Sequence, residues 1–292
     1  MTSIKYIVSI FFASILFSAC EITIDYDLPQ IPDRITIETR LTAGDSASVI
    51  VGTSKYALSN KDPEFLNFDA TVWLYENNIP VSQLIPTPNT SGINFSYTSN
   101  YQLKTNQVYK VEAAINGYSN AFGEGLLKEP VPINSTEYDS INRNLKFTFH
   151  DPPTAGDYYM ITLSAGFQSN YPIYFSTNDI SIDFFVDESF SDPFGGNEED
   201  YGDKGYFTDQ YFNGKDKSIR ITILDEGFQF NNVPLTIELW RINKDLYDHE
   251  RTKAVAWESE NPFSEPVQIY SNIENGYGIV GTVAVSKRQF YP

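Results

Sequence analysis

Apolar and polar side chains alternate with a period of two along several segments of this chain. The clearest are residues 145–150 (LKFTFH), 219–223 (IRITI) and 235–240 (LTIELW), in which every odd-numbered residue is apolar. Successive side chains of a strand point to opposite faces of a sheet. The pattern therefore predicts strands with one face in a core and the other face wetter. A chain built on such segments is constrained to be a β-sheet protein.

The composition favours the same fold class. Phe, Tyr and Trp make up 15% of the 292 residues, and the chain has 17 Gly and 16 Pro. Strands favour β-branched and aromatic side chains, whereas Gly and Pro mark the turns between strands. In the first half we expect strands at residues 34–41, 47–53, 70–76, 92–97, 108–115 and 121–127. The last two flank Asn116-Gly117, a dipeptide typical of a hairpin turn.

We predict an all-β fold of β-sandwich units with one helix in the C-terminal half. Residues 33–130 have the size of an immunoglobulin-like or transthyretin-like sandwich, and residues 131–292 would form a second β-rich domain. The boundary is expected at residues 129–132 (EPVP), where two prolines interrupt strand pairing. The helix is predicted near residues 244–257, with Asn243 as its N-cap.

Residues 1–19 have the layout of a secretory signal peptide. Lys5 is followed by fourteen almost entirely apolar residues, and small residues precede Cys20, the only cysteine of the chain. Fourteen residues are too few for a membrane-spanning helix, which needs about 20. Because a lone cysteine has no disulfide partner, we interpret Cys20 as the lipidated first residue of the mature chain. Residues 20–32 would then be an extended tether. The alternative is an ordinary signal peptide followed by a chance cysteine.

The charge of the chain excludes one class of partner. The formal net charge is −18, and removal of residues 1–19, whose one charged side chain is Lys5, makes it −19. A chain this acidic does not bind nucleic acid through the phosphates. It is not drawn to an anionic membrane by charge either. We therefore expect contact with the membrane through the lipid on Cys20.

Gly276, Gly278 and Gly281 fit the G-x-G-x-x-G fingerprint of dinucleotide-binding proteins. That motif needs a following helix within a βαβ unit, whereas residues 279–285 have the pattern of a strand. We expect these glycines to serve a turn at Asn275-Gly276 and a close approach of two backbones.

The chain has few histidines that could serve in catalysis or in metal binding. Its two histidines are His150 and His249, and with Cys20 assigned to the lipid a Cys/His zinc site is excluded. His150-Asp151 could orient a serine nucleophile, but no G-x-S-x-G motif accompanies the pair. His150 also falls on the polar face of its strand, so we predict a surface histidine. We predict no catalytic residue, no metal site and no cofactor.

The segment 179–209 carries ten carboxylates and one base, Lys204. The carboxylates are Asp179, Asp183, Asp187, Glu188, Asp192, Glu198, Glu199, Asp200, Asp203 and Asp209. This density is compatible with calcium binding or with a pair of glycosidase carboxylates. A solvated acidic loop between strands is the interpretation we favour.

Several segments carry a resemblance to a known family. Besides Cys20 and its preceding residues, they are residues 22–29, 149–153 with 158–159, 207–209 with 212–214, and 261–279. On these residues the chain resembles the bacterial lipoproteins of domain-of-unknown-function family 4249. The resemblance implies an outer-membrane lipoprotein, found beside TonB-dependent transporters, without established catalytic residues. Residues 70–76 and 108–118 are also similar to the transthyretin-like modules of such transporters.

The leading functional hypothesis is a non-catalytic binding or accessory component, with a TonB-dependent outer-membrane transporter as its partner. The partner is what the resemblance implies, and attachment to one membrane would raise the effective concentration of both proteins. A surface-anchored, glycan-directed hydrolase that uses carboxylates of the acidic segment is the alternative. A structural or adhesion protein of the envelope is the third.

Overall fold

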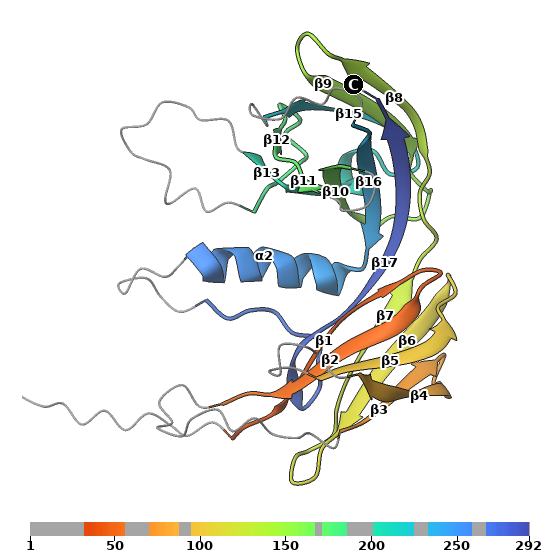
Figure 1. The fold of residues 1–292 in the computed structure, drawn as a ribbon, viewed down its shortest axis with the longest axis vertical. Helices are drawn as coiled ribbons and strands as arrows, with labels where there is room; N and C mark the ends of the chain where they lie inside the picture. The colour runs from red at the N-terminus through yellow and green to blue at the C-terminus, as the bar shows by residue number, and fades with distance from the viewer. Residues whose placement is uncertain are drawn as a thin grey trace, which may run out of the picture. The chain divides into compact units, whose positions relative to one another are not determined.

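The computed structural model describes residues 32–55, 70–87, 95–166, 171–185, 201–224, 233–258 and 267–291. The expected signal peptide, Cys20 and the tether as far as residue 31 lie outside these residues. Within them the chain is mostly β-structure in two sheets, with one α-helix (Figure 1). This confirms the predicted fold class. No helix in the described ranges has the length and apolar character needed to cross a membrane.

The described part of the first half of the chain forms seven strands. They are β1 (Ile35–Thr42), β2 (Ser46–Thr53), β3 (Thr71–Glu76), β4 (Ile79–Thr87), β5 (Phe95–Gln102), β6 (Gln107–Ala114) and β7 (Ala121–Leu127). Strands β6 and β7 form the hairpin predicted at Asn116-Gly117, where Gly117 has a φ of +88°. The part of predicted strand 92–97 before Phe95 lies outside the described residues.

The second half contains, among its described residues, ten strands, a short 3-10 helix and the α-helix. The longer strands are β8 (Ile133–Asp139), β9 (Asn144–His150), β10 (Tyr158–Ala165), β14 (Lys204–Thr208), β15 (Asp216–Ile223), β16 (Leu235–Ile242) and β17 (Gly276–Phe290). The short ones are β11 (Tyr171–Pro172), β12 (Phe175–Ser176) and β13 (Tyr201–Gly202). The 3-10 helix is η2 (Asp209–Tyr211), and the α-helix is α2 (Lys244–Glu258).

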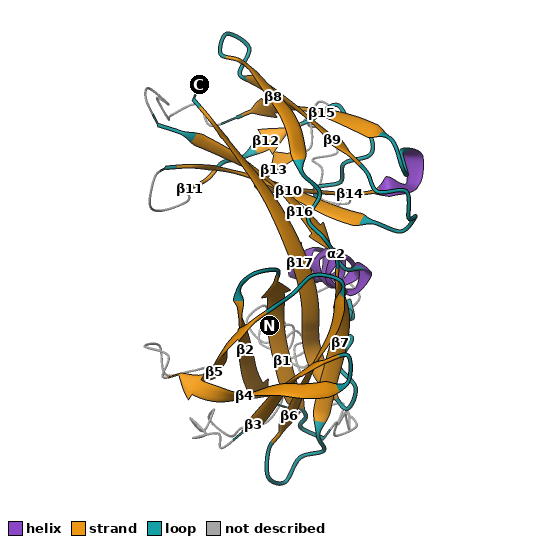
Figure 2. Ribbon diagram, turned by 90° about the vertical axis from the view of Figure 1, so that its right-hand side faces the viewer, coloured by secondary structure: helices purple, strands orange, loops and turns teal. Residues whose placement is uncertain are grey.

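Strand β17 belongs to both halves of the larger sheet. The order of this sheet is β11-β10-β16-β17-β1-β2-β5-β4-β3-β6-β7, with β14 paired to β10. β17 runs antiparallel to β16 and parallel to β1 (Figure 2). Phe122 of β7 also exchanges backbone hydrogen bonds with Glu274, just before β17. The expected boundary at residues 129–132 therefore lies between two sets of strands that share β17.

Each half has its own apolar core. In the first half, residues from β1, β2, β3, β6 and β7 pack with Ile273 and with Val280 of β17. In the second half, β9 and β15 of the smaller sheet (β13-β12-β15-β9-β8) pack against β10, β14 and β16 of the larger one. The apolar residues of the three predicted strands lie in this second core, and Phe147, Ile221 and Ile237 are fully buried. The alternation thus predicted the inward face correctly.

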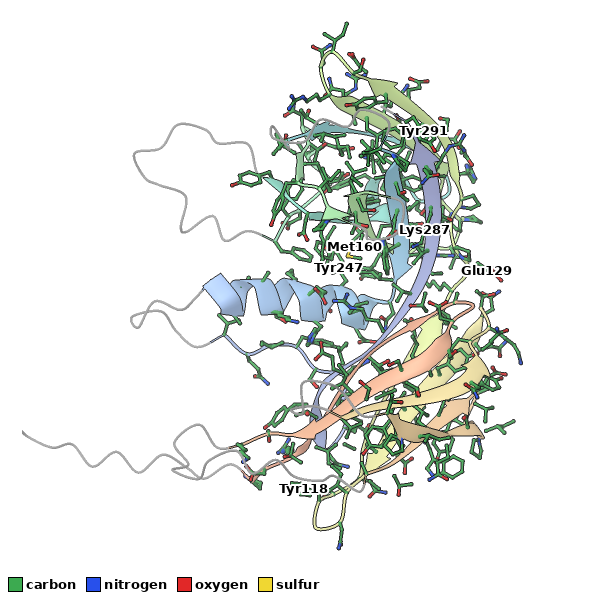
Figure 3. The ribbon with its side chains drawn as sticks, viewed as in Figure 1. Tyr118, Glu129, Met160, Tyr247, Lys287 and Tyr291 are labelled. Carbon is green, nitrogen blue, oxygen red and sulfur yellow. The ribbon has the colours of Figure 1, made fainter. Side chains whose placement is uncertain are left out.

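The outward face of β16 differs from the prediction of a wetter surface. Glu238 is only 5% exposed and forms an ion pair with Lys287 of β17, at 2.6 Å. Ile242 and Met160 lie in a third apolar cluster between the larger sheet and α2, together with Leu246 of the helix. Figure 3 labels Met160 and Tyr247, which packs against this cluster. Strands β10 and β16 are therefore covered on both faces.

Helix α2 confirms the helix predicted near residues 244–257. The side chain of Asn243 accepts a hydrogen bond from the backbone N–H of Leu246, at 3.4 Å, as an N-cap does. The same Oδ1 atom accepts the N–H of Thr282 in β17, at 3.1 Å. The cap therefore also fixes the start of the helix against the sheet.

Candidate functional site

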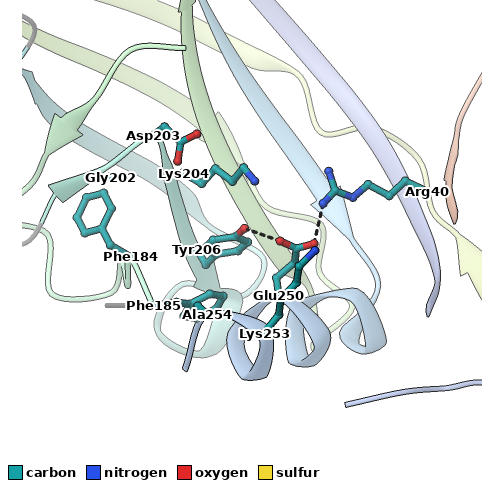
Figure 4. A pocket seen from close by; sticks show the side chains of 10 residues that line it. All are labelled: Arg40, Phe184, Phe185, Gly202, Asp203, Lys204, Tyr206, Glu250, Lys253 and Ala254. Carbon is teal, nitrogen blue, oxygen red and sulfur yellow. Dashed lines mark hydrogen bonds and ion pairs between the residues drawn. The ribbon is translucent and has the colours of Figure 1, made fainter. Parts of the chain in front are cut away.

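A pocket of about 360 Å³ lies where α2, β1 and the β13–β14 segment meet (Figure 4). Its lining contains five charged residues, which are Arg40, Asp203, Lys204, Glu250 and Lys253. It also contains three aromatic residues, which are Phe184, Phe185 and Tyr206. Ligand sites are typically concave, in the range of roughly 300–1,000 Å³, and combine apolar walls with a few placed polar groups. This pocket has that make-up, and we refer to it as the α2 pocket.

Arg40 lines the α2 pocket because buried and exposed side chains alternate along strand β1. Ile35, Ile37 and Leu41 are fully buried in the first core, whereas Glu38 and Arg40 point to the opposite face. Arg40 forms an ion pair with Glu250, at 2.6 Å between Nη2 and Oε1. These two residues are 210 positions apart in the chain and are joined by the packing of α2 near β1 and β17.

Helix α2 presents a second set of groups to the pocket. Tyr247, Glu250 and Ala254 recur at spacings of three and four, so they lie on one face of the helix. Tyr247 packs in the cluster beneath the pocket, and Glu250 and Ala254 line it.

The segment before β17 holds α2 from the other side. His249 donates from Nδ1 to the carbonyl oxygen of Tyr270, at 2.7 Å, and the N–H of Tyr270 donates to Thr252 Oγ1, at 2.8 Å. The hydroxyl of Tyr270 donates to Asp245, at 2.6 Å, and this bond raises the pKa of Tyr270 to about 12.

Glu250 stays ionised in this setting. Burial acts to raise its pKa, but the charges of Arg40 and Lys204, the hydrogen bond from Arg40 and the charge of Lys253 lower it further than burial raises it. The side chain of Glu250 is 12% exposed, against 44% for Arg40. The hydroxyl of Tyr206 donates to the other carboxylate oxygen at 3.4 Å (Figure 4). One carboxylate thus faces three cationic side chains.

Stacked aromatic rings form the apolar wall of the α2 pocket. Phe185 stacks on Tyr206 with ring centroids 4.1 Å apart, and it meets Tyr247 edge-on at 5.2 Å. Phe184 packs on Phe175 at 5.5 Å. These contacts fix the rings in place, because Phe185 and Tyr206 are each at most 5% exposed.

A second hollow of about 630 Å³ lies on the outer face of β9 and β15. It is larger than the α2 pocket but is lined mainly by polar groups, among them Lys146, Asp179 and Arg220. Asp179 is engaged by Lys217 at 2.7 Å. Because it lacks a wall of ordered aromatic rings, we take the α2 pocket as the candidate site.

Three aspartates, two of which lie in segments that carry the family resemblance, are buried together. Asp151, Asp157 and Asp209 are at most 4% exposed, and one oxygen of each lies within 4.8 Å of the others. We call them the acidic cluster. Asp157 receives Arg241 in a bidentate pair, at 2.6 and 2.8 Å from Nη2, and Lys128 at 2.5 Å. The three carboxylates of the acidic cluster therefore have two cationic side chains beside them, those of Arg241 and Lys128.

The other two aspartates of the acidic cluster each accept a backbone N–H, and Asp151 also accepts a side-chain hydroxyl. Asp151 accepts the hydroxyl of Tyr159, at 2.5 Å, and the N–H of Gly214, at 2.9 Å. Asp209 accepts the N–H of Gly156, at 2.8 Å. Burial raises the pKa of Asp151 and the neighbouring charges of Asp157 and Asp209 add to that rise, against the hydrogen bonds. The cluster therefore connects the β9–β10 and β14–β15 loops. We assign it a structural role.

The histidines lie apart from any catalytic arrangement in the described residues. His150 is exposed and contacts Asp216 at 2.8 Å, as its position on the polar face predicts. Asp151 follows it in sequence but points into the protein, so His150 and Asp151 do not form a pair. His249 is buried against Tyr270.

The acidic segment is only partly a solvated loop. Asp187, Glu188, Asp192, Glu198, Glu199 and Asp200 lie outside the described residues. Of the others, Asp179 pairs with Lys217 and Asp183 accepts the N–H of Phe185, at 2.6 Å. Asp209 contradicts the prediction, because it is buried in the acidic cluster, where it binds the Gly156 N–H. Asp203 and the one base, Lys204, line the α2 pocket.

The glycines of the apparent dinucleotide fingerprint serve strand and helix packing. A Cβ at Gly276 would lie 2.6 Å from the carbonyl oxygen of Ile35, and one at Gly278 would lie 2.0 Å from that of Ile37. At Gly281 a Cβ would lie 3.0 Å from the side chain of Leu246. The first two glycines permit the close parallel pairing with β1, and the third permits the approach of α2. The predicted close approach of backbones is confirmed.

Comparisons with known proteins agree with the resemblance. The family described as Domain of unknown function (DUF4249) matches residues 21–289. No curated protein matches the chain. Among solved structures, a β-glucuronidase from Parabacteroides merdae is similar over 73% of this chain and 24% of its own length, at 11% identity and a TM-score of 0.20. The chain thus spans about a quarter of that enzyme, and the likeness carries no argument about function.

Proposed function

Because the chain belongs to the DUF4249 family, we propose that it is a lipid-anchored, non-catalytic binding component of the outer membrane. Its ligand is held in the α2 pocket, and the lipid on Cys20 attaches it to the membrane. The observation that carries the binding function is the pocket itself. Charged and aromatic side chains from β1, α2 and the β13–β14 segment converge on one space of ligand size.

The make-up of the α2 pocket favours binding over hydrolysis. Among the described residues that line it, none is Ser, Thr, Cys or His. A glycosidase needs one carboxyl group with a raised pKa to act as general acid. The pKa of Glu250 is instead lowered, because Arg40 and two lysines outweigh the effect of burial. The alternative of a carboxylate-dependent hydrolase therefore has less support than the binding function.

A pocket-filling variant tests the binding function even though the ligand is unidentified. Ala254→Trp places an indole ring in the α2 pocket from the face of the helix that lines it. The full mature chain and this variant are equilibrated with a small-molecule extract of the source cells. Bound compounds are then identified by native mass spectrometry. A compound retained by the wild type and lost from the variant supports the proposal. Identical retention, or turnover of a retained compound, contradicts it.

The membrane attachment is tested at Cys20. Replacement by Ala removes the thiol that would carry the lipid, and cell fractionation with a salt wash follows the protein. The variant should leave the membrane fraction, because the acidic mature chain is not attracted to anionic lipid. A variant that stays in the washed membranes would show that something other than the lipid is the anchor.

We extend the proposal to a partner in the same membrane, a TonB-dependent transporter. The support is the family to which the chain belongs, and confinement to one membrane makes a weak interface sufficient. Affinity purification of the wild-type protein from gently solubilised membranes should recover such a transporter. Recovery of the lipoprotein alone, with unimpaired growth of a deletion strain on limiting nutrients, would contradict the partner.

A further inference from the structure

The α2 pocket has a charge opposite to that of the chain as a whole. The protein has 38 acidic and 20 basic residues, yet Arg40, Lys204 and Lys253 line the pocket with two carboxylates, Asp203 and Glu250. Lys204 is the one base among the ten carboxylates of residues 179–209. The pocket thus has a net positive charge in a strongly acidic protein.

The cationic side chains of Arg40, Lys204 and Lys253 all lie near the carboxylate of Glu250. All three lower the pKa of Glu250 by their charge, so they lie close to its carboxylate. Figure 4 shows their side chains converging on Glu250 from β1, β14 and α2. The side chain of Arg40 is 44% exposed despite its ion pair, and it lines the pocket. A guanidinium is well suited to carboxylate and phosphate groups, which it binds in a planar, bidentate manner.

The opposite wall is apolar and rigid. Phe185 and Tyr206 are stacked face to face, and Phe184 is fixed by its contact with Phe175. Phe185 and Tyr206 are nearly buried and support this wall, whereas Phe184 is only partly buried and offers its ring for contact with a flat apolar group. The pocket therefore combines an anion-binding side with an apolar side.

We propose that the α2 pocket binds a small organic anion whose carboxylate or phosphate faces Arg40, Lys204 and Lys253 and whose flat apolar part contacts Phe184 and Phe185. The inference rests on the proposed binding function and specifies its ligand class. Glu250 occupies the anion position in the unliganded protein. An incoming anion competes with that carboxylate for Arg40.

This competition gives a variant that should gain affinity. Glu250→Gln removes the internal carboxylate and frees Arg40, so an anionic ligand should bind about three- to tenfold more tightly, the effect of one partly screened unit charge at short range. Lys204→Gln and Lys253→Gln should each lower the affinity for the anionic ligand by a similar factor. A gain of affinity cannot arise from a misfolded protein, so the first variant guards against loss of structure as an explanation.

The experiment measures affinities by ligand-observed NMR titration of the full mature chain with Cys20→Ser, which carries no lipid. The probes share a benzene ring and differ in charge: phenyl phosphate, benzoate, benzamide and benzylamine. Inorganic phosphate supplies charge without the ring. Matched controls are Glu137→Gln and Lys215→Gln, because Glu137 is paired with Lys146 on the smaller sheet and Lys215 is exposed in the loop before β15.

The expected order places phenyl phosphate and benzoate above benzamide, benzylamine and inorganic phosphate, with changes in the pocket variants and none in the controls. Unchanged anion affinity in Glu250→Gln would overturn the inference. Tighter binding of benzamide or benzylamine, abolished by Ala254→Trp, would refute the anion class and leave the binding function standing. No binding of any probe, with no compound retained from the cell extract, would refute both.

Discussion

Single glycines determine how closely the strands of this protein can pair. At Gly278, a Cβ would lie 2.0 Å from the carbonyl oxygen of Ile37, and the φ of +107° is one that L-residues rarely adopt. The glycine therefore meets two separate requirements, a left-handed backbone and an open space beside β1. The pattern Gly276, Gly278 and Gly281 is thus explained by β1 and α2 packing rather than by a nucleotide.

Gly278→Ala should lower the free energy of unfolding by at least about 3 kcal/mol, because backbone strain of about 1–2 kcal/mol is added to a clash that separates β1 from β17. Gly44→Ala is the matched control, since Gly44 has a φ of +84° with nothing within 4 Å of a Cβ. It should lose about 1–2 kcal/mol from strain alone. Urea unfolding measures both variants. An equal decrease in unfolding free energy for the two variants would show that the close approach to Ile37 does not affect stability.

Arg241 is the main counter-charge of the acidic cluster. Its side chain is 8% exposed and that of Asp157 is fully buried. Arg241→Leu should therefore cost about 3–5 kcal/mol of unfolding free energy, because a buried carboxylate loses its bidentate partner. Lys146→Leu breaks the exposed pair with Glu137 and should cost at most about 1 kcal/mol. Similar costs for the two substitutions, measured by denaturant unfolding, would refute a structural role for the cluster.

Among individual residues, exposed side chains could be predicted from the sequence more reliably than buried polar side chains. His150 is exposed because its strand alternates, and alternation is a local property. Asp209 is buried because Gly156 and the β9–β10 loop cover it, and their position depends on strands more than forty residues away. The pair Arg40–Glu250 could not be predicted from the sequence, because 210 residues separate its members. The one available signal was Lys204, the single base in an acidic segment.

Elements that show one apolar face were predictable, and elements covered on both faces were not. Strands β9, β15 and β16 carry a clear alternation, and α2 has a cap and the spacing of an amphipathic helix. Strand β10 is buried on both sides, between the second core and the α2 cluster, so its sequence does not alternate. Strand β4 is exposed over most of its length and contains Pro80 and Pro86. Both strands lack the periodicity on which sequence prediction depends.

Glu250 links the stability of α2 to pH. Its pKa in the folded protein lies below the ordinary value of 4.5, so its ionised form stabilises the fold above that pH, and the contribution is lost as the pH falls through the lowered pKa. Glu250→Gln should therefore be less stable than the wild type at pH 7, and the difference should shrink as the pH falls below about 4.5. Thermal unfolding across this range measures it. A difference that grows in acid would contradict the assigned direction of the pKa shift.

The whole molecule depends on its last strand. Strand β17 pairs with β1 and β16, and Val280 from it lies in the core of the first half. The parallel pairing of β1 with β17 joins segments about 240 residues apart, and no local sequence pattern indicates such a pairing. The sequence therefore predicted a strand at residues 279–285 but not that β1 is its partner. Residues 33–292 form one compact unit.

A fragment of residues 33–130 should therefore not fold cooperatively by itself. It contains β1 to β7 but lacks β17, so β1 loses its parallel partner and the core loses Ile273 and Val280. Residues 33–292 provide the matched control. The fragment is expected to unfold without a sigmoidal transition, as followed by circular dichroism in urea. A cooperative transition would show that the first half is an independent domain.

We propose the α2 pocket, and not another surface, as the binding site of this protein. Hydrogen–deuterium exchange of the full mature chain with and without saturating phenyl phosphate locates the site directly. Peptides that cover residues 202–206 and 250–254 should exchange more slowly with the ligand, because these residues line the α2 pocket. Peptides that cover residues 144–146 and 218–222, in the larger polar hollow, should be unchanged. Protection of the hollow without protection of α2 would contradict the claim.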